Sequence, residues 1–183
     1  LNGEGMIARE GSIVDASFVD APRQRNTREQ NAQIKAGERP EGFEANKAKG
    51  KQKDCDAPWT KKNTETHYGY KNHAKVDAKN KLVLSYKSTA ASVHESQVLE
   101  DLIGDEDEAV FADSAYTSKS SDELLLKNGC QNFIQFKAQR GHPLTAEEIA
   151  TNKLRSRIRV RCEHIFGRMS QMALDRLRSI GLA

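Results

Sequence analysis

The feature that most constrains the fold is a continuous apolar run at 109–112, Ala-Val-Phe-Ala, which ends at Asp113. A strand without polar alternation is typical of a sheet whose two faces are both covered. Helical patterns flank this run, since 92–103 opens with a capping Ser and carries an apolar stripe, and 120–127 ends before Asn-Gly. We therefore expect an α/β fold, with Asp113 at the carboxyl end of a central strand, where such sheets present their ligands.

The remaining patterns extend this strand into a mixed sheet. Strand-like composition and period occur at 12–19, 67–76, 82–86, 109–112 and 130–136. The first three segments predict an antiparallel three-strand meander, and the last two predict parallel strands joined through helical crossovers. Thr145 caps a final long helix with one apolar stripe. The predicted fold class is thus α/β, with a mixed sheet and flanking helices.

The segment at about 21–63 differs from the rest of the chain. It is rich in Lys, Glu, Gly, Asn and Ala, contains Pro22, Pro40 and Pro58, and shows no apolar period. We interpret it as a long, basic, flexible insertion within a single domain that covers 1–183. The chain does not begin with Met, which predicts a fragment of a longer protein.

Basic residues gather on either side of an acidic centre. Residues 47–75 hold eight Lys against three acidic residues, and 153–178 hold eight Lys or Arg against two. Residues 94–113 hold eight Asp or Glu and no Lys or Arg. This distribution favours a polyanion held against a metal site, although solvated faces of mixed charge are the commoner explanation of any single patch.

Several classes of protein are excluded by the composition. No stretch approaches the roughly 20 apolar residues of a membrane helix, and the start lacks the pattern of a signal peptide. Cys55, Cys130 and Cys162 lack zinc-site spacing, so we expect idle thiols in a reducing cytoplasm. No glycine-rich phosphate loop is present in the sequence.

Three carboxylates stand where a charge needs an explanation. Asp15 lies in the middle of the first predicted strand, where an unpaired charge costs several kcal/mol. Asp113 ends the central strand, and Glu163 lies on the last helix, one turn after Arg159. Each has an ordinary alternative: a paired or edge-exposed Asp15, a turn-capping Asp113, and a helical ion pair between Glu163 and Arg159. Their combination favours one site that binds divalent metal.

The segments around these acids resemble the successive signatures of DDE transposases of bacterial insertion sequences, of the IS-four/IS-five type. The resemblance rests on GSIVDAS at 11–17, HYGYKNH at 67–73, FADSAY at 111–116 and RVRCEHIFG at 159–167. The family carries a Tyr seven residues before its Glu, an Arg four before it and a Lys seven after it. Here Arg159 matches the Arg, Ser156 and Ser170 replace the other two, and Arg168 can substitute for the Lys.

The resemblance implies an RNase H-like fold in which Asp15, Asp113 and Glu163 form a catalytic triad that binds two Mg²⁺ ions, with Mn²⁺ able to substitute. It implies DNA transposition: cleavage and strand transfer on double-stranded DNA, at terminal inverted repeats and a target site. It also implies a homodimer of the intact protein, associated with the bacterial nucleoid, and further sequence beyond both ends of this chain.

The candidate DNA contacts lie on two predicted elements and one loop. They are Lys71, His73, Tyr116, Arg155, Arg159 and Arg168. The basic side chains would bind phosphates, and Tyr116 would either stack on a base or pack in the core. Two alternatives remain open: an RNase H-like nuclease without strand transfer, and an inactive remnant that only binds DNA.

Overall fold

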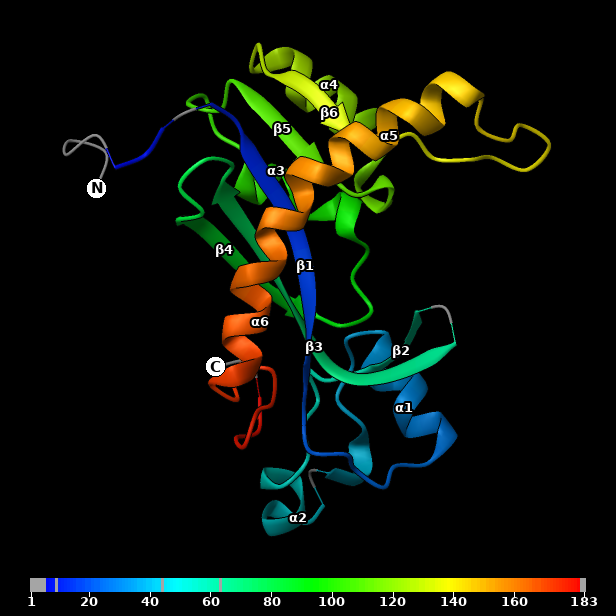
Figure 1. Ribbon diagram of the computed structural model, residues 1–183. Helices are drawn as coiled ribbons and strands as arrows, with labels where there is room; N and C mark the ends of the chain where they lie inside the picture. Colours follow the sequence, from blue (N-terminus) through cyan, green and yellow to red (C-terminus); the bar gives the residue numbers. More distant parts are fainter. Residues whose placement is uncertain (1–5, 9, 44, 63, 182–183) are drawn as a thin grey trace. The chain divides into compact units, whose positions relative to one another are not determined.

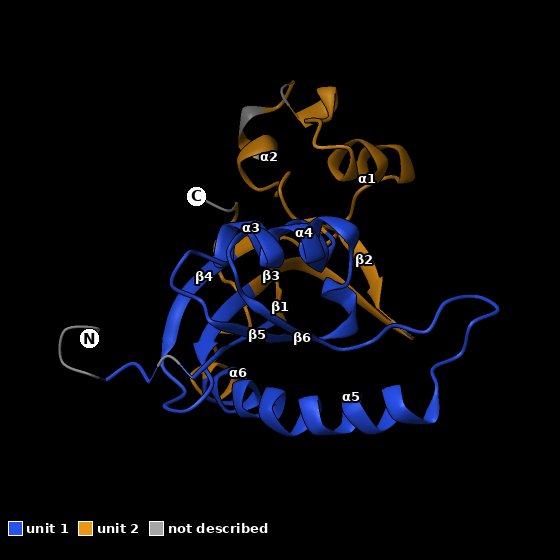
Figure 2. Ribbon diagram, turned by 90° about the horizontal axis from the view of Figure 1, so that it is seen from above, with its two compact units in different colours: residues 1–16, 73–87, 94–168 blue, residues 17–72, 88–93, 169–183 orange. Residues whose placement is uncertain are grey.

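The computed structural model describes residues 6–8, 10–43, 45–62 and 64–181. Contacts divide the chain into two compact units, drawn in blue and orange in Figure 2. The first unit comprises residues 1–16, 73–87 and 94–168, and the second comprises 17–72, 88–93 and 169–183. Strands β1 (Ser12–Asp20) and β3 (Glu65–Asp77) each run from one unit into the other.

A sheet forms the centre of the first unit. Its strands follow the order β3, β1, β5 (Ala109–Ala112) and β6 (Gln131–Ile134), and β4 (Val83–Ala90) pairs with β3 (Figure 1). Strand β5 lies parallel to both of its neighbours, β1 and β6. Every residue of β5 is buried, so the strand predicted from the apolar run is confirmed.

Helices cover both faces of this sheet. In Figure 2, α3 (Leu99–Leu102) and α4 (Lys119–Lys127) lie on one face, and α5 (Ala146–Arg159) lies on the other. A short 3-10 turn, η2 (Glu95–Gln97), precedes α3 and is capped by His94. On the α5 side, the core joins Ile13, Val76, Phe111 and Cys162. This layering explains why β5 needs apolar residues at every position.

The last predicted helix is interrupted. Its start is as expected, since the side chain of Thr145 accepts a hydrogen bond from the Glu148 amide at 3.2 Å. However, α5 ends at Arg159, and a 3-10 turn, η4 (Val160–Cys162), separates it from α6 (Glu163–Gln171). The turn places Cys162 in the core at 0% exposure. Glu163 therefore opens a new helix and does not continue α5.

The second unit contains the segment interpreted as an insertion. That segment holds α1 (Arg28–Lys35), the 3-10 turn η1 (Glu41–Phe43), α2 (Lys47–Lys51) and β2 (Trp59–Lys62). Strand β2 pairs antiparallel with the start of β3. With the parallel strands of the first unit, this pairing confirms the predicted α/β class and its mixed sheet.

A buried carboxylate organises the second unit. Asp54 is 1% exposed and accepts a hydrogen bond from the Tyr70 hydroxyl at 2.7 Å. It also accepts hydrogen bonds from the backbone amides of Ala57 and Gly181 at 3.1 Å each. These bonds join β3, the segment before β2 and the C-terminal tail. They give order to a region that is poor in apolar residues.

Candidate active site

Two of the three predicted acids lie level with each other at one edge of the first unit's sheet. Val14 of β1 is paired in register with Ala112 of β5. The next residues along these parallel strands are Asp15 and Asp113, so their backbones stand about one strand spacing apart, roughly 4.8 Å. The charge of Asp113 is close enough to raise the pKa of Asp15. Asp113 directly follows β5, at the carboxyl end where α/β proteins bind ligands, whereas Asp15 lies within β1, directly after the stretch that pairs with β5.

Arg159 is the immediate partner of Asp15. Its guanidinium donates a hydrogen bond to the Asp15 carboxylate, and both side chains are largely covered, at 20% and 14% exposure. The Ala16 amide donates to the other carboxylate oxygen at 2.9 Å. Burial nevertheless raises the pKa of Asp15, against the lowering effect of Arg159. The pair thus compensates only part of the desolvation of this acid.

Glu163 is not drawn into the same group. It begins α6 with an exposed side chain, directly after buried Cys162. Burial, followed by the charge of Asp15, raises the pKa of the Cys162 thiol to about 12, and Glu163 adds to this shift. Among the described residues, no group of three or more acidic, His or Cys side chains is close enough to hold a metal ion. The carboxylates of Asp15 and Asp113 are the kind of hard oxygen donor that Mg²⁺ prefers.

The family comparison agrees with this geometry. The family model described as "Transposase DDE domain" matches residues 7–183. The chain belongs to this family. No solved structure matches the chain.

Two residues predicted to touch DNA are buried beside the acids of this DDE domain. Tyr116 ends a 3-10 turn, η3 (Ser114–Tyr116), that starts directly after Asp113. It is 1% exposed, and His73 on β3 is 0% exposed. The Tyr116 hydroxyl lies 3.3 Å from His73 Nδ1. As placed here, protein covers both side chains, so a role within the domain explains them better than a DNA contact.

The arginines of the last two helices are placed differently from one another. Arg155 donates a hydrogen bond to the Ile134 carbonyl and lies over the Phe136 ring, 4.5 Å from its centroid. Its Nε is buried without a hydrogen-bond partner. Arg168 on α6 is exposed. Of the predicted phosphate contacts on these helices, only Arg168 presents its side chain to solvent in this structure.

Lys71 belongs to the second unit of the DDE domain. It is 6% exposed, and its ammonium donates a hydrogen bond to the Val93 carbonyl at 2.9 Å. The ammonium also lies 5.3 Å from the centroid of the Phe18 ring. The Lys71 ammonium thus makes its contacts within the second unit. Its contact with DNA stays a prediction.

Sequence reasoning missed the polar contact that Ser156 makes. This residue stands where the family carries a Tyr, and its hydroxyl accepts a hydrogen bond from Gln135 Nε2 at 2.6 Å. Gln135 directly follows β6, so the bond ties the sheet edge to α5. The sequence showed that Ser156 replaces the family's Tyr seven residues before Glu163. It did not show that Gln135 would be the hydrogen-bond partner of Ser156.

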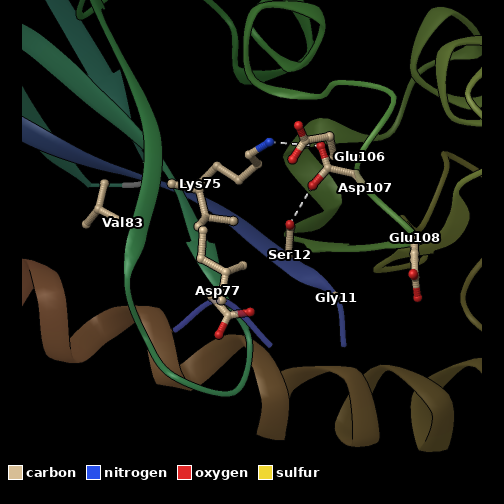
Figure 3. A pocket seen from close by; sticks show the side chains of 10 residues that line it. Gly11, Ser12, Lys75, Asp77, Val83, Glu106, Asp107 and Glu108 are labelled. Carbon is tan, nitrogen blue, oxygen red and sulfur yellow. Dashed lines mark hydrogen bonds and ion pairs between the residues drawn. The ribbon is translucent and has the colours of Figure 1, made fainter. Parts of the chain in front are cut away.

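A second polar cluster lies at the opposite ends of the parallel strands. Asp107 accepts hydrogen bonds from the Ser12 hydroxyl at 2.5 Å and the Lys75 ammonium at 2.8 Å (Figure 3). It borders a cavity of about 270 Å³ that Glu106 and Glu108 also line. The sequence showed this stretch only as part of the acidic centre at 94–113, so the pairing of Asp107 with Lys75 was missed. The cluster is separate from the Asp15 edge.

No helix in the described part of the chain is long and apolar enough to cross a membrane.

Proposed function

We propose that this chain is the catalytic core of an insertion-sequence transposase that cuts and joins double-stranded DNA with divalent metal ions. The observation that carries the proposal is the placement of Asp15 and Asp113 directly after Val14 and Ala112, the last residues that β1 and β5 pair in register. It stands in a chain whose family match covers nearly its whole length. In this proposal the DNA is a transposon end with its inverted repeat, then a target site, and the intact protein acts as a homodimer in the nucleoid.

The chain's own residues supply the ligands and the counter-ions. Asp15 and Asp113 would hold Mg²⁺ or Mn²⁺ through carboxylate oxygens, and Glu163 would complete the set by approaching them. Such ions, when bound, activate the attacking oxygen and stabilise the leaving oxygen. Arg159, which contacts Asp15 in this structure, would be available to bind a DNA phosphate if Asp15 served as a metal ligand.

The proposed reaction does not require a covalent intermediate between the enzyme and DNA. A water oxygen bonds to phosphorus, the bond from phosphorus to the 3′-oxygen breaks, and that oxygen takes up a proton. The product is a free 3′-hydroxyl and a 5′-phosphate. In strand transfer, the same 3′-hydroxyl attacks a phosphorus of the target DNA and displaces another 3′-oxygen. Both reactions, cleavage and strand transfer, require the protein only to position the reacting groups and to stabilise charge.

Plasmid nicking tests the proposal. The chain is incubated with supercoiled plasmid and Mn²⁺, and the open-circular product is measured. Asp15→Asn and Asp113→Asn should each abolish nicking, whereas Asp105→Asn should leave it unchanged, because Asp105 is exposed and precedes β5, while Asp113 follows it. Nicking that persists in Asp113→Asn would overturn the assignment. Joining of a labelled duplex end to the plasmid separates a transposase from a nuclease without strand transfer.

One observation favours the alternative of a remnant that only binds DNA. Arg159 already neutralises Asp15, and Glu163 stands apart from the two aspartates. An active site would have to release the first contact and bring in the third acid. Calorimetric titration with Mn²⁺ decides between the two functions, since a remnant would show no Mn²⁺ binding that depends on Asp113. The remnant would still bind labelled duplex DNA.

A further inference from the structure

Tyr116 is anchored to the first unit at three points. Its amide donates a hydrogen bond to the Asp113 carbonyl at 2.9 Å. Its carbonyl accepts one from the Ser121 hydroxyl of α4 at 2.7 Å. Its own hydroxyl meets His73 on β3. A surface tyrosine that waits for a DNA base would not be fixed at its amide, its carbonyl and its hydroxyl together.

The order of the strands indicates which residue the Tyr116 ring lies next to. Asp113 and Tyr116 follow β5, His73 lies on β3, and β1 stands between these two strands. A side chain that reaches from the end of β5 to β3 must therefore cross the position where β1 carries Asp15. The electrostatics agree, because the pKa of Tyr116 is raised first by burial and then by Asp15, with Asp113 contributing as well.

The direction of the hydrogen bond depends on the His73 tautomer. A phenol that is buried near carboxylates keeps its proton at neutral pH, since ionisation would add another negative charge. Tyr116 therefore has a proton to donate, and His73 Nδ1, 3.3 Å away, accepts it in the tautomer whose own proton lies on Nε2. The opposite tautomer would make His73 the donor.

We propose that Tyr116 and His73 form a positioning pair that holds Asp113 level with Asp15. The inference rests on the proposed function, because it concerns the spacing of two metal-binding carboxylates. The bond from Tyr116 to the Asp113 carbonyl fixes the turn after β5, and the bond to His73 fixes the far end of the ring. Neither residue touches DNA or metal in this role. They act through the placement of the Asp113 backbone.

Metal affinity measured on hydrogen-bond variants tests the pair. Calorimetry with Mn²⁺ alone is run on the full chain and on Tyr116→Phe, His73→Leu and His73→Asn. Losing one hydrogen bond between neutral groups should weaken Mn²⁺ binding by roughly 3- to 10-fold in Tyr116→Phe and in His73→Leu. His73→Asn should retain most of the affinity, because its amide oxygen can accept the Tyr116 proton. Tyr86→Phe is the matched control, since Tyr86 is 72% exposed.

The outcomes separate this inference from the proposed function. Wild-type chain that binds no Mn²⁺ overturns both. Wild-type binding with unchanged affinity in Tyr116→Phe overturns the positioning pair and leaves the proposed function standing. Nitrogen NMR of the His73 ring gives a second reading without metal: a proton on Nε2 supports the pair, and a proton on Nδ1 overturns it. Equal weakening in His73→Asn and His73→Leu would also count against the hydrogen bond and indicate packing alone.

Discussion

Replacing Lys75 with Met should destabilise the first unit strongly. Lys75 is paired with Asp107 inside the protein, where the two side chains are 12% and 4% exposed. The substitution keeps the aliphatic length of the side chain and removes its charge. Asp107 would keep hydrogen bonds from the Ser12 hydroxyl at 2.5 Å (Figure 3) and from the Gly104 amide at 2.9 Å. A buried carboxylate would then have no counter-ion.

The expected cost follows from this burial. Removing one partner of a buried ion pair typically costs about 3–5 kcal/mol, because the other charge stays desolvated. Two hydrogen bonds remain on Asp107, so we expect the lower end, about 3 kcal/mol. The double variant Lys75→Met with Asp107→Leu should recover most of the loss, since no unpaired charge is left. The single variant Lys75→Met should therefore be less stable than the double variant.

Urea unfolding measures the effect, with an exposed ion pair as control. Lys79 pairs with Glu10, and their side chains are 55% and 61% exposed. Lys79→Met should cost no more than about 0.5 kcal/mol. Far-UV circular dichroism follows the whole chain, while Trp59, the sole Trp, reports the second unit. If Lys75→Met and Lys79→Met lowered the free energy of unfolding by the same small amount, burial would not determine the cost of losing the ion pair.

Three further substitutions have defined expected effects. Gly69→Ala should cost well over about 3 kcal/mol in thermal unfolding, because φ is +144° and an added Cβ would lie 2.3 Å from the Val19 carbonyl oxygen. Tyr70→Phe should cost about 1.5–3 kcal/mol in urea unfolding, since it removes a hydrogen bond to a carboxylate, that of Asp54. Burial raises the pKa of Cys130 from 9.0 to about 11, so its thiol stabilises the fold below pH 9 and this stabilisation is lost as pH rises to 11. Wild type should therefore lose stability relative to Cys130→Ala over that window, and a constant difference between the two would contradict the shift.

The sheet of the first unit could be predicted because its signals are local. Four apolar residues before Asp113 predict a buried strand, and each residue of that strand is buried. Thr145 with Glu148 three residues on predicts the start of a helix, and the capping bonds form. Each inference needed only neighbours in sequence. The break at η4 was missed because the apolar stripe continues across it, and only the burial of Cys162 decides the tighter turn.

The second unit could not be predicted in the same way. Its segment at 21–63 has few apolar residues, so composition predicts flexibility. Its order depends on Asp54, whose partners include Tyr70 and Gly181, far along the chain. Bonds between distant residues leave no period in the sequence. Whether this segment moves in solution stays a prediction, while its helices and strand show that few apolar residues do not prevent regular structure.

The candidate site shows the same division between local and distant signals. Asp15 and Asp113 were predicted from strand position, and register places them level. The partner of Arg159 was not predictable, because Glu163 is its natural neighbour one turn on and Asp15 is 144 positions away. Likewise, His73 was predicted to contact DNA, and Tyr116 was predicted either to stack on a base or to pack in the core. Their burial follows from the order of β3, β1 and β5, which sequence patterns did not fix.

The contact of Arg159 with Asp15 explains how the chain can hold two carboxylates on neighbouring strands. Burial raises the pKa of Asp15, and the charge of Asp113 adds to this rise, so an ionised Asp15 is costly at this position. A guanidinium from the end of α5 offsets part of that cost and keeps Asp15 in place. The same contact ties the helix that precedes Glu163 to β1. Release of Arg159 would therefore free the Asp15 carboxylate and loosen the turn before Glu163 in one step, so Arg159 couples the first of the three predicted acids to the third.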